Sequence, residues 1–291
     1  MRPLGLLVLL LSCLAYAAPA YAQNLAVVDR PLGTDTANVV DSGEVLAGVG
    51  VEHVRLPGQE TLTSAPVLSS RLGIAGIAEF SATYRWLWRE SRDMRDTNGT
   101  GDLYLFGKLR LLDGLDDDGS PSVLPPTAIR LGVKLPNASA RERLGTNNTD
   151  FSMLGLVTPR VGPVEVRLSG GLLIIESPTD PLAQTDAWAY SAALLVDLPG
   201  GVTPFVEYYG QTTNAPAFEL AEGRAGLRWT RGRLGLDLSA SMGFNGSRPL
   251  GATGELSRDW GIALGATYRF DLPGFGRTWG RPNGAASTPR R

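Results

Sequence analysis

The stretch Ile77-Ala-Glu-Phe-Ser-Ala-Thr-Tyr-Arg-Trp-Leu-Trp88 has a period of two, with small and aromatic residues at every second position. In a strand, successive side chains point to opposite faces, whereas a helix would scatter these aromatics around its circumference. The stretch therefore predicts a β-strand with one apolar and one polar face. The apolar face carries Ala78, Phe80, Ala82, Tyr84, Trp86 and Trp88, and the polar face carries Glu79, Ser81, Thr83 and Arg85.

The same alternation recurs along the chain and predicts about twelve strands in all. Most have about 9–12 residues, which is the length a tilted strand needs to cross a bilayer. Beyond residue 22, no apolar run approaches the ~18 residues of a membrane-spanning helix. The predicted strands lie near residues 44–54, 67–75, 77–88, 102–111, 129–135, 150–159, 164–174, 187–198, 202–211, 221–229, 233–242 and 259–270.

The connections between these strands alternate in length. Tight-turn residues occur at 75–76, 160–163, 199–201 and 231–232. Longer polar segments occur at 55–66, 89–100, 136–149, 176–186, 212–219 and 245–257. This alternation is typical of outer-membrane barrels, which have short periplasmic turns and longer outer loops. The connection 113–126 is an exception, because it is long where a short turn is expected.

Alternation alone does not tell which face is inside, because a soluble sandwich and a membrane barrel give the same pattern. The aromatic residues decide in favour of the barrel, since they gather at strand ends according to strand direction, as in interfacial girdles. We therefore predict an all-β fold: a transmembrane antiparallel β-barrel of about twelve strands with longer outer loops. The predicted girdle consists of Trp86, Trp88, Trp188, Tyr208, Trp229, Trp260, Tyr268 and Phe270.

The polar strand faces predict the lining of the barrel lumen. Twelve strands at ~4.8 Å spacing and ~40° tilt close with a backbone diameter of roughly 24 Å, which leaves roughly 8–12 Å between opposing side chains. The sequence thus predicts a narrow lumen for small molecules, or one closed by its own salt bridges. The predicted lining residues are Glu79, Arg85, Asp102, Lys108, Arg110, Arg130, Lys134, Glu165, Arg167, Glu222, Arg224 and Arg228.

Composition excludes several classes of function. The 291 residues carry a formal net charge of −2, from 27 bases and 29 acids. The chain therefore lacks the basic excess that nucleic-acid binding requires. One histidine and one cysteine leave no material for a zinc site or for thiol catalysis. We expect no metal, no cofactor and no nucleic-acid partner.

The N-terminus predicts a secretory signal peptide over residues 1–22. Arg2 precedes an apolar core at 4–14, and Ala20-Tyr21-Ala22 forms a small-x-small cleavage site. Cleavage as a lipoprotein at Cys13 is the alternative, but Leu11 is bulky for that motif. We expect export to the bacterial outer membrane. Residues 23–43 then form either a periplasmic segment or a plug in the lumen, 44–270 the barrel, and 271–291 a flexible tail.

No catalytic residue is predicted. His53 is the only histidine, and a family of twelve-stranded outer-membrane phospholipases places its nucleophilic serine two residues after the histidine, where this chain has Arg55. Inward carboxylates are more typical of charge networks with arginines than of acid–base pairs. The acidic stretch 113–119 does not match a calcium loop, since Gly114 and Pro125 would stand at its first and twelfth ligand positions.

Three short motifs carry a family resemblance. They are Arg30-Pro-Leu-Gly-Thr-Asp-Thr-Ala37 leading to Gly43-Glu44, Gly101-Asp-Leu-Tyr-Leu105 with Lys108 and Arg110-Leu-Leu112, and Leu131-Gly-Val-Lys-Leu-Pro136 with Leu144-Gly-Thr146 and Thr149-Asp-Phe151. Together they resemble the phenol-degradation meta-pathway family of outer-membrane proteins over roughly residues 28–270. The resemblance implies an outer-membrane β-barrel that transports small, sometimes aromatic, compounds. It implies no catalytic residues, and the tail after Phe270 departs from the family pattern.

The sequence as a whole predicts an outer-membrane channel or uptake protein for a small solute, including hydrophobic or aromatic ones. Its expected partners are outer-membrane lipid, the solute and the barrel-assembly machinery, which would recognise the strand ending Tyr268-Arg269-Phe270. A lipid-modifying enzyme and a closed structural barrel are the alternatives. Mutual pairing of the inward charges would favour the closed barrel.

Overall fold

The computed structural model shows strands, turns and loops and, in the ranges it describes, no helix. No helix there is long and apolar enough to cross a membrane. The predicted signal peptide, residues 23–31 and most of the acidic stretch 113–119 lie outside the described residues, as does the tail beyond residue 272. The described ranges are 32–56, 60–92, 95–115, 122–176, 184–213, 220–244 and 259–272.

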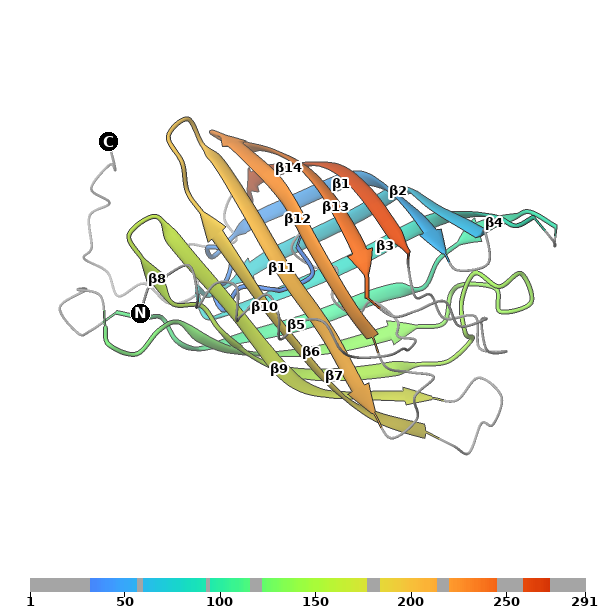
Figure 1. Cartoon of the computed structure of the whole chain (residues 1–291). Helices are drawn as coiled ribbons and strands as arrows, with labels where there is room; N and C mark the ends of the chain where they lie inside the picture. Colours follow the sequence, from blue (N-terminus) through green and yellow to red (C-terminus); the bar gives the residue numbers. More distant parts are fainter. Residues whose placement is uncertain are drawn as a thin grey trace, which may run out of the picture.

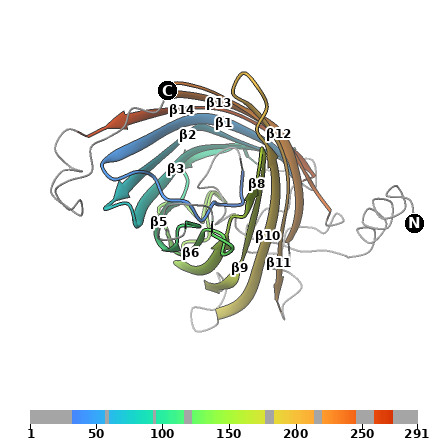
Figure 2. The same cartoon turned by 90° about the vertical axis from the view of Figure 1, so that its left-hand side faces the viewer.

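Twelve long antiparallel strands of the described chain close into a barrel (Figures 1 and 2). Each strand pairs with the next long one along the chain, and β14 pairs with β1 to close the ring. The predicted fold class is thereby confirmed. The strands are β1 (Glu44–Leu56), β2 (Glu60–Ile74), β3 (Ala78–Glu90), β5 (Leu103–Leu112), β6 (Thr127–Leu135), β7 (Asp150–Val157), β9 (Val164–Glu176), β10 (Gln184–Val196), β11 (Val202–Thr213), β12 (Leu220–Arg231), β13 (Leu234–Gly243) and β14 (Trp260–Asp271), with the short β4 (Thr97–Thr100) and β8 (Arg160–Val161) beside β3 and β9.

Burial along each strand is the reverse of that in a soluble sandwich. On β3, Phe80 and Trp88 are 44% and 40% exposed on the outer surface, whereas Glu79 and Thr83 are each 2% exposed and face the lumen. The apolar face therefore points outward and the polar face inward, as in a barrel that stands in hydrocarbon.

The two ends of the barrel differ in their connections. At one end, called the turn end here, lie the short connections 75–77, 158–163, 197–201 and 232–233, together with the longer 113–126. Gly76 and Gly232 have φ of +70° and +60° there, a conformation that glycine adopts without steric cost. At the opposite end, called the loop end, lie the described residues 95–102 and 136–149, and β9, β11 and β13 end there while β10, β12 and β14 begin.

The prediction of a long loop at 55–66 is wrong. β1 extends to Leu56 and β2 begins at Glu60, so three residues join them. The serine and threonine content of 60–64 and the proline at 66 obscured the strand in the sequence. A shift of register between Ser64 and Val67 accommodates Pro66, which has no N–H to donate to the ladder.

Candidate functional site

The candidate site is the lumen, and residues 32–43 cross it at the turn end. Figure 2 shows this blue segment inside the ring of strands, ahead of β1. Leu32 and Ala37 are fully buried, and Asp35 is 2% exposed. We call residues 32–43 the inner segment. These residues are the described part of the predicted N-terminal segment 23–43, whose first nine residues lie outside the described ranges.

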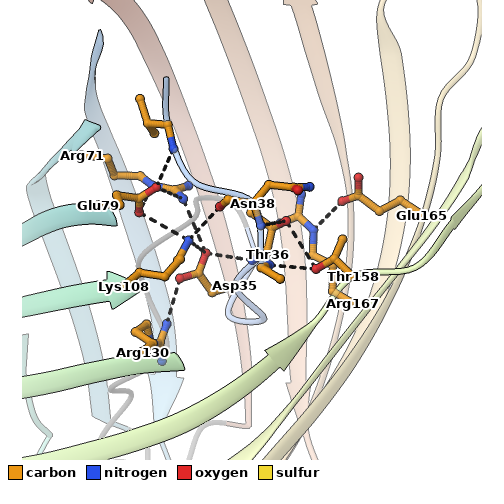
Figure 3. Close-up of polar contacts among 12 residues, drawn as sticks. Asp35, Thr36, Asn38, Arg71, Glu79, Lys108, Arg130, Thr158, Glu165 and Arg167 are labelled. Atoms are coloured by element: carbon orange, nitrogen blue, oxygen red, sulfur yellow. Dashed lines mark hydrogen bonds and ion pairs between the residues drawn. The ribbon is translucent and has the colours of Figure 1, made fainter. Parts of the chain in front are cut away.

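Three cations of the barrel wall surround the Asp35 carboxylate (Figure 3). Its Oδ1 lies 3.0 Å from Lys108 Nζ and 3.6 Å from an Arg71 nitrogen, and its Oδ2 lies 3.5 Å from an Arg130 nitrogen. Lys108 and Arg130 are cross-strand partners on β5 and β6, while Arg71 comes from β2. We call these three residues the cationic cage.

Glu79 is the wall carboxylate beside this cage. Its oxygens accept hydrogen bonds from Arg71 at 2.8 and 3.0 Å, and Lys108 Nζ lies 3.4 Å away. Glu79 also accepts the N–H of Val40 at 3.1 Å, and Lys108 donates to the Asn38 carbonyl at 3.2 Å. The wall therefore binds the backbone of the inner segment as well as its aspartate.

Two further wall residues hold the backbone of the inner segment. The N–H groups of Gly33 and Thr34 donate to the Glu207 carboxylate at 2.8–3.0 Å. The N–H of Ala37 donates to Thr158 Oγ1 at 2.8 Å. Residues 40–41 pass so close to Gly73 of β2 that any Cβ at that position would overlap their carbonyl groups.

A second segment, residues 136–149 between β6 and β7, covers the lumen at the loop end, and we call it the outer segment. Ala138 and Leu144 are its buried apolar side chains. They pack against inward-facing apolar residues of the first three strands, which interrupt the polar lining near the loop end. These wall residues are Val54, Leu56, Leu62 and Leu87.

A buried lysine ties the outer segment to the wall. Lys134 has no exposed surface, and its Nζ lies 2.6 Å from Asp150 and 3.8 Å from Asp102. It also donates to Thr146 Oγ1 of the outer segment at 2.7 Å. Asp102 in turn accepts the N–H of Ala138 at 2.9 Å. One cation and two carboxylates thus fix this segment from both sides.

An arginine-rich cavity lies at the loop end, between the outer segment and residues 89–91 and 95–98. Glu60 receives hydrogen bonds from Arg89 and from Arg143, and Arg89 donates to the Arg143 carbonyl at 2.6 Å. Beside this cluster lies a cavity of about 620 Å³. It is lined by Arg89, Ser91, Arg95, Asp96, Thr97, Asn98, Arg141, Glu142 and Arg143.

One side of the lumen is apolar, which sequence reasoning missed. Inward side chains of β6, β7, β9 and β10 form a buried cluster there, and Ala37 of the inner segment and Tyr104 pack against it. The run Leu172-Leu-Ile-Ile175 carried the signal, because four consecutive apolar residues make both strand faces apolar. We call this cluster the apolar wall. It comprises Ala128, Leu154, Leu156, Leu173, Ile175, Ala187 and Ala189.

The predicted lining residues fall into separate groups. Glu79, Lys108 and Arg130 meet around Asp35, and Asp102 meets Lys134. Other pairs form elsewhere in the lumen: Arg85 with Glu52 at 3.4 Å, Arg167 with Glu165 at 2.7 Å, and Arg224 with both Glu222 at 2.9 Å and Glu207 at 3.4 Å. Arg110 and Arg228 are half-buried, and Arg228 pairs in register with Asp237. Sequence reasoning placed Glu207 on an inward face but missed Asp35, Arg71 and Asp150.

The predicted girdle residues stand on the outward face. Trp86, Trp88, Trp188, Tyr208 and Trp260 lie on the loop-end halves of their strands, and Trp229, Tyr268 and Phe270 on the turn-end halves. Rings contact one another within both groups, with centroids 6.3 Å apart for Trp86 and Trp88 and 4.8 Å apart for Tyr268 and Phe270.

His53 also lies on the outward face, near the loop end of β1. Its Nδ1 lies 2.8 Å from the Thr63 hydroxyl, and its ring centroid is 5.8 Å from that of Trp260. In the described part of the chain, no group of three or more His, Cys, Asp or Glu residues has the geometry to hold a metal ion.

The chain is similar to solved outer-membrane barrels. An outer membrane channel from Pseudomonas putida F1 is 14% identical with a TM-score of 0.54, over 80% of this chain and 98% of that one. The translocator domain of the autotransporter NalP from Neisseria meningitidis (12% identity, TM-score 0.48, 79% and 89% covered) and the β domain of the Bordetella autotransporter BrkA (13%, 0.46, 79% and 100%) score lower. At these identities the likeness supports the fold and nothing more specific.

No family model matches the chain, and no curated protein matches it either. The resemblance to the phenol-degradation meta-pathway family therefore stays a prediction.

Proposed function

We propose that this protein is an outer-membrane channel or uptake protein for a small solute, and that the inner segment must move for the solute to pass. The observation that carries the proposal is how this segment is held. From Gly33 to Val40, its described polar contacts with the barrel join a carboxylate and backbone groups to side chains, and Leu32 and Ala37 are buried beside them. The strand pairing that closes the barrel does not involve these residues, so this part of the segment is separable from the barrel.

The outer surface supports the proposed location. Exposed apolar side chains cover the strands between two groups of aromatic residues, which is the arrangement of a barrel in a lipid bilayer. On this proposal the turn end faces the periplasm and the loop end faces outward. Outer-membrane lipid, the assembly machinery and the solute stay its expected partners.

A closed structural barrel is the second candidate, and the pairing of inward charges favours it. Arg71 with Glu79, Lys134 with Asp150 and Arg167 with Glu165 all lie within 2.9 Å, so much of the lumen charge is neutralised by its neighbours. The two candidates differ in one measurable property, which is whether ions pass through the lumen when the inner segment is free.

A disulfide lock tests the proposal. Thr36 and Thr158 have hydroxyl oxygens 3.4 Å apart, so cysteines at these positions would face each other. The chain's single cysteine, Cys13, lies in the predicted signal peptide. In the Thr36→Cys/Thr158→Cys variant we expect low KCl conductance in planar bilayers when oxidised and a several-fold increase on reduction.

The single variant Thr158→Cys is the matched control, and its conductance should not respond to the reductant. Equal conductance of the oxidised and reduced double variant would show that the inner segment is no gate. The absence of conductance in both states, together with the absence of solute uptake by liposomes, would favour the closed structural barrel.

A further inference from the structure

We propose that the cationic cage and the apolar wall form a binding site for a solute that carries a carboxylate on an apolar body. In this structure the inner segment occupies the site, with Asp35 in the place of the carboxylate and Ala37 in the place of the apolar body. This inference rests on the proposed channel function and names the chemical class of its solute.

The charges of the cage call for an anion. Arg71, Lys108 and Arg130 are all less than 10% exposed, and the wall carboxylate Glu79 pairs with Arg71 and Lys108. Without Asp35, the cage would lose the carboxylate that lies within 3.6 Å of all three of its cations. Because an excess of buried charge is costly, the departure of the inner segment leaves a strong preference for a replacement anion.

The donors of the cage are also released by that departure. Two of the three contacts of Lys108 Nζ go to the inner segment, at 3.0 Å to Asp35 and 3.2 Å to the Asn38 carbonyl. Arg130 contributes planar guanidinium donors from the neighbouring strand, and such donors match the geometry of a carboxylate.

The apolar wall lies within reach of the same ligand. Ala37 packs into the wall and is two residues from Asp35. Two residues of extended chain span at most about 7 Å. The sites that Asp35 and Ala37 occupy therefore lie close enough together for an acid with a single ring or a short branched chain to reach both. Benzoate is therefore a suitable probe.

The cavity at the loop end also favours anions. It is lined by four arginines and two acids, and Glu60 beside it pairs with two of the arginines, which still leaves a positive excess. Such an excess raises the local concentration of anions at the mouth of a pore. Its charged residues are Arg89, Arg95, Arg141 and Arg143 against Asp96 and Glu142.

Equilibrium dialysis of labelled benzoate against the purified full chain in detergent tests the site. A tethered carboxylate competes at an effective concentration of the order of mM or more, so Asp35→Asn should bind benzoate about tenfold more tightly than the parent chain. Benzamide, the neutral analogue, should not bind, and acetate, which lacks the apolar body, should bind more weakly than benzoate.

Three further arms locate the binding. Adding Lys108→Met to Asp35→Asn should abolish it, whereas adding Arg160→Met, which removes a positive charge at the exposed turn-end rim, should leave it unchanged. In Thr36→Cys/Thr158→Cys, oxidation should abolish benzoate binding and reduction should restore it. This last arm uses an intact cage and does not depend on the folding of a charge variant.

The outcomes separate the inference from the proposed function. If the reduced double-cysteine variant conducts KCl while neither it nor Asp35→Asn binds benzoate, the solute assignment is wrong and the channel stands. If benzamide bound as tightly as benzoate, the solute assignment would also be wrong. If acetate bound as tightly as benzoate, the apolar wall would not be part of the binding site. Benzoate binding without conductance in any variant would overturn the channel instead.

Discussion

The inner and outer segments both obstruct the lumen, but they are attached in different ways. The outer segment buries Ala138 and Leu144 against apolar wall residues and surrounds the fully buried Lys134. The inner segment also buries Leu32 and Ala37 against apolar residues of the barrel, and in addition Asp35 and backbone N–H groups bind wall side chains and Thr158. Water and ions can replace these polar contacts, whereas they do not replace apolar packing. Because polar contacts run along the inner segment from Gly33 to Val40, it is the better candidate for a movable gate and the outer segment for a fixed constriction.

The place of each segment in the chain also makes the inner segment easier to displace than the outer segment. The outer segment joins β6 to β7 and is fixed at both ends by strands. The inner segment is followed by β1, and in the described chain no strand precedes it. Displacement of residues 33–42 therefore need not disturb the described pairing of the long strands, which Gly43 extends through backbone hydrogen bonds with Gly73 and Leu272.

Lys134→Met should have the largest effect on stability, because Lys134 belongs to the wall and cannot leave. Its loss strands the buried carboxylates of Asp102 and Asp150 without their cation, at a cost of about 3–5 kcal/mol. Urea unfolding in detergent micelles, followed by tryptophan fluorescence, measures this cost.

The control for this variant is Lys134→Met combined with Asp102→Asn and Asp150→Asn. It leaves no unpaired charge and should recover most of the stability. An unfolding free energy of Lys134→Met equal to that of the parent chain would contradict a fixed, charge-anchored outer segment.

Glu207→Gln should have an intermediate effect, mainly on the inner segment, because Arg224, which also pairs with Glu207, keeps its closer pair with Glu222. The carboxylate accepts hydrogen bonds from the N–H groups of Gly33 and Thr34, and a bond to a charged group contributes about 1.5–3 kcal/mol. Glutamine retains one acceptor oxygen, so we expect local opening to become easier by about 1–2 kcal/mol. Hydrogen–deuterium exchange of peptides covering 32–43 should be faster, while global unfolding changes little.

Glu165→Gln serves as the control, since the described contacts of Glu165 go to Arg160 and Arg167 of the wall. It should leave exchange in 32–43 unchanged. Faster exchange in the outer segment than in the inner one after Glu207→Gln would reverse the ranking of the two segments.

The strand period explains which parts of this comparison the sequence could predict. A period of two fixes the face of each residue, so the inward positions of Lys108, Arg130 and Lys134 followed from their neighbours alone. Their partners did not follow, because pairing depends on which strands are adjacent and in what register. The long connection 113–126 leaves the register of β5 against β6 open, so the meeting of Lys108 and Arg130 could not be foreseen.

Asp35 was beyond sequence reasoning for a different reason. It lies in a segment without periodicity, and its contacts with the wall cations join residues 36 to 95 positions apart in the chain. The apolar wall escaped because Leu173 and Ile175 stand among apolar neighbours, and because the small inward residues Ala187 and Ala189 give a weak signal. Alternation detects a strand only where its two faces differ.

The exposed ion pair between Arg160 and Asp197 at the turn end should contribute least to the free energy of unfolding, so its removal should have the smallest effect of the three. Burial alone would raise the pKa of Asp197, but hydrogen bonds from Arg160 at 2.7 Å and from Thr203 at 2.8 Å lower this pKa below its ordinary value. A carboxyl whose pKa is lowered on folding stabilises the protein above its unfolded pKa of about 3.9, and this contribution disappears as the pH falls through the lower, folded pKa. Because both side chains are about half exposed, solvent screening keeps it under about 1 kcal/mol.

Asp197→Asn isolates this contribution from those of the other carboxyls. The parent chain should be slightly more stable than the variant at pH 7, and the difference should vanish as the pH falls below the lowered, folded pKa of Asp197. At pH 7, added NaCl should also reduce it, since salt screens exposed charges, while the cost of Lys134→Met should persist because that site is buried. Two results would contradict this ranking. One is a stability difference between the parent chain and Asp197→Asn that grows as the pH falls. The other is an equal effect of NaCl on the costs of Asp197→Asn and Lys134→Met, since the buried ion pair would then respond like the exposed one.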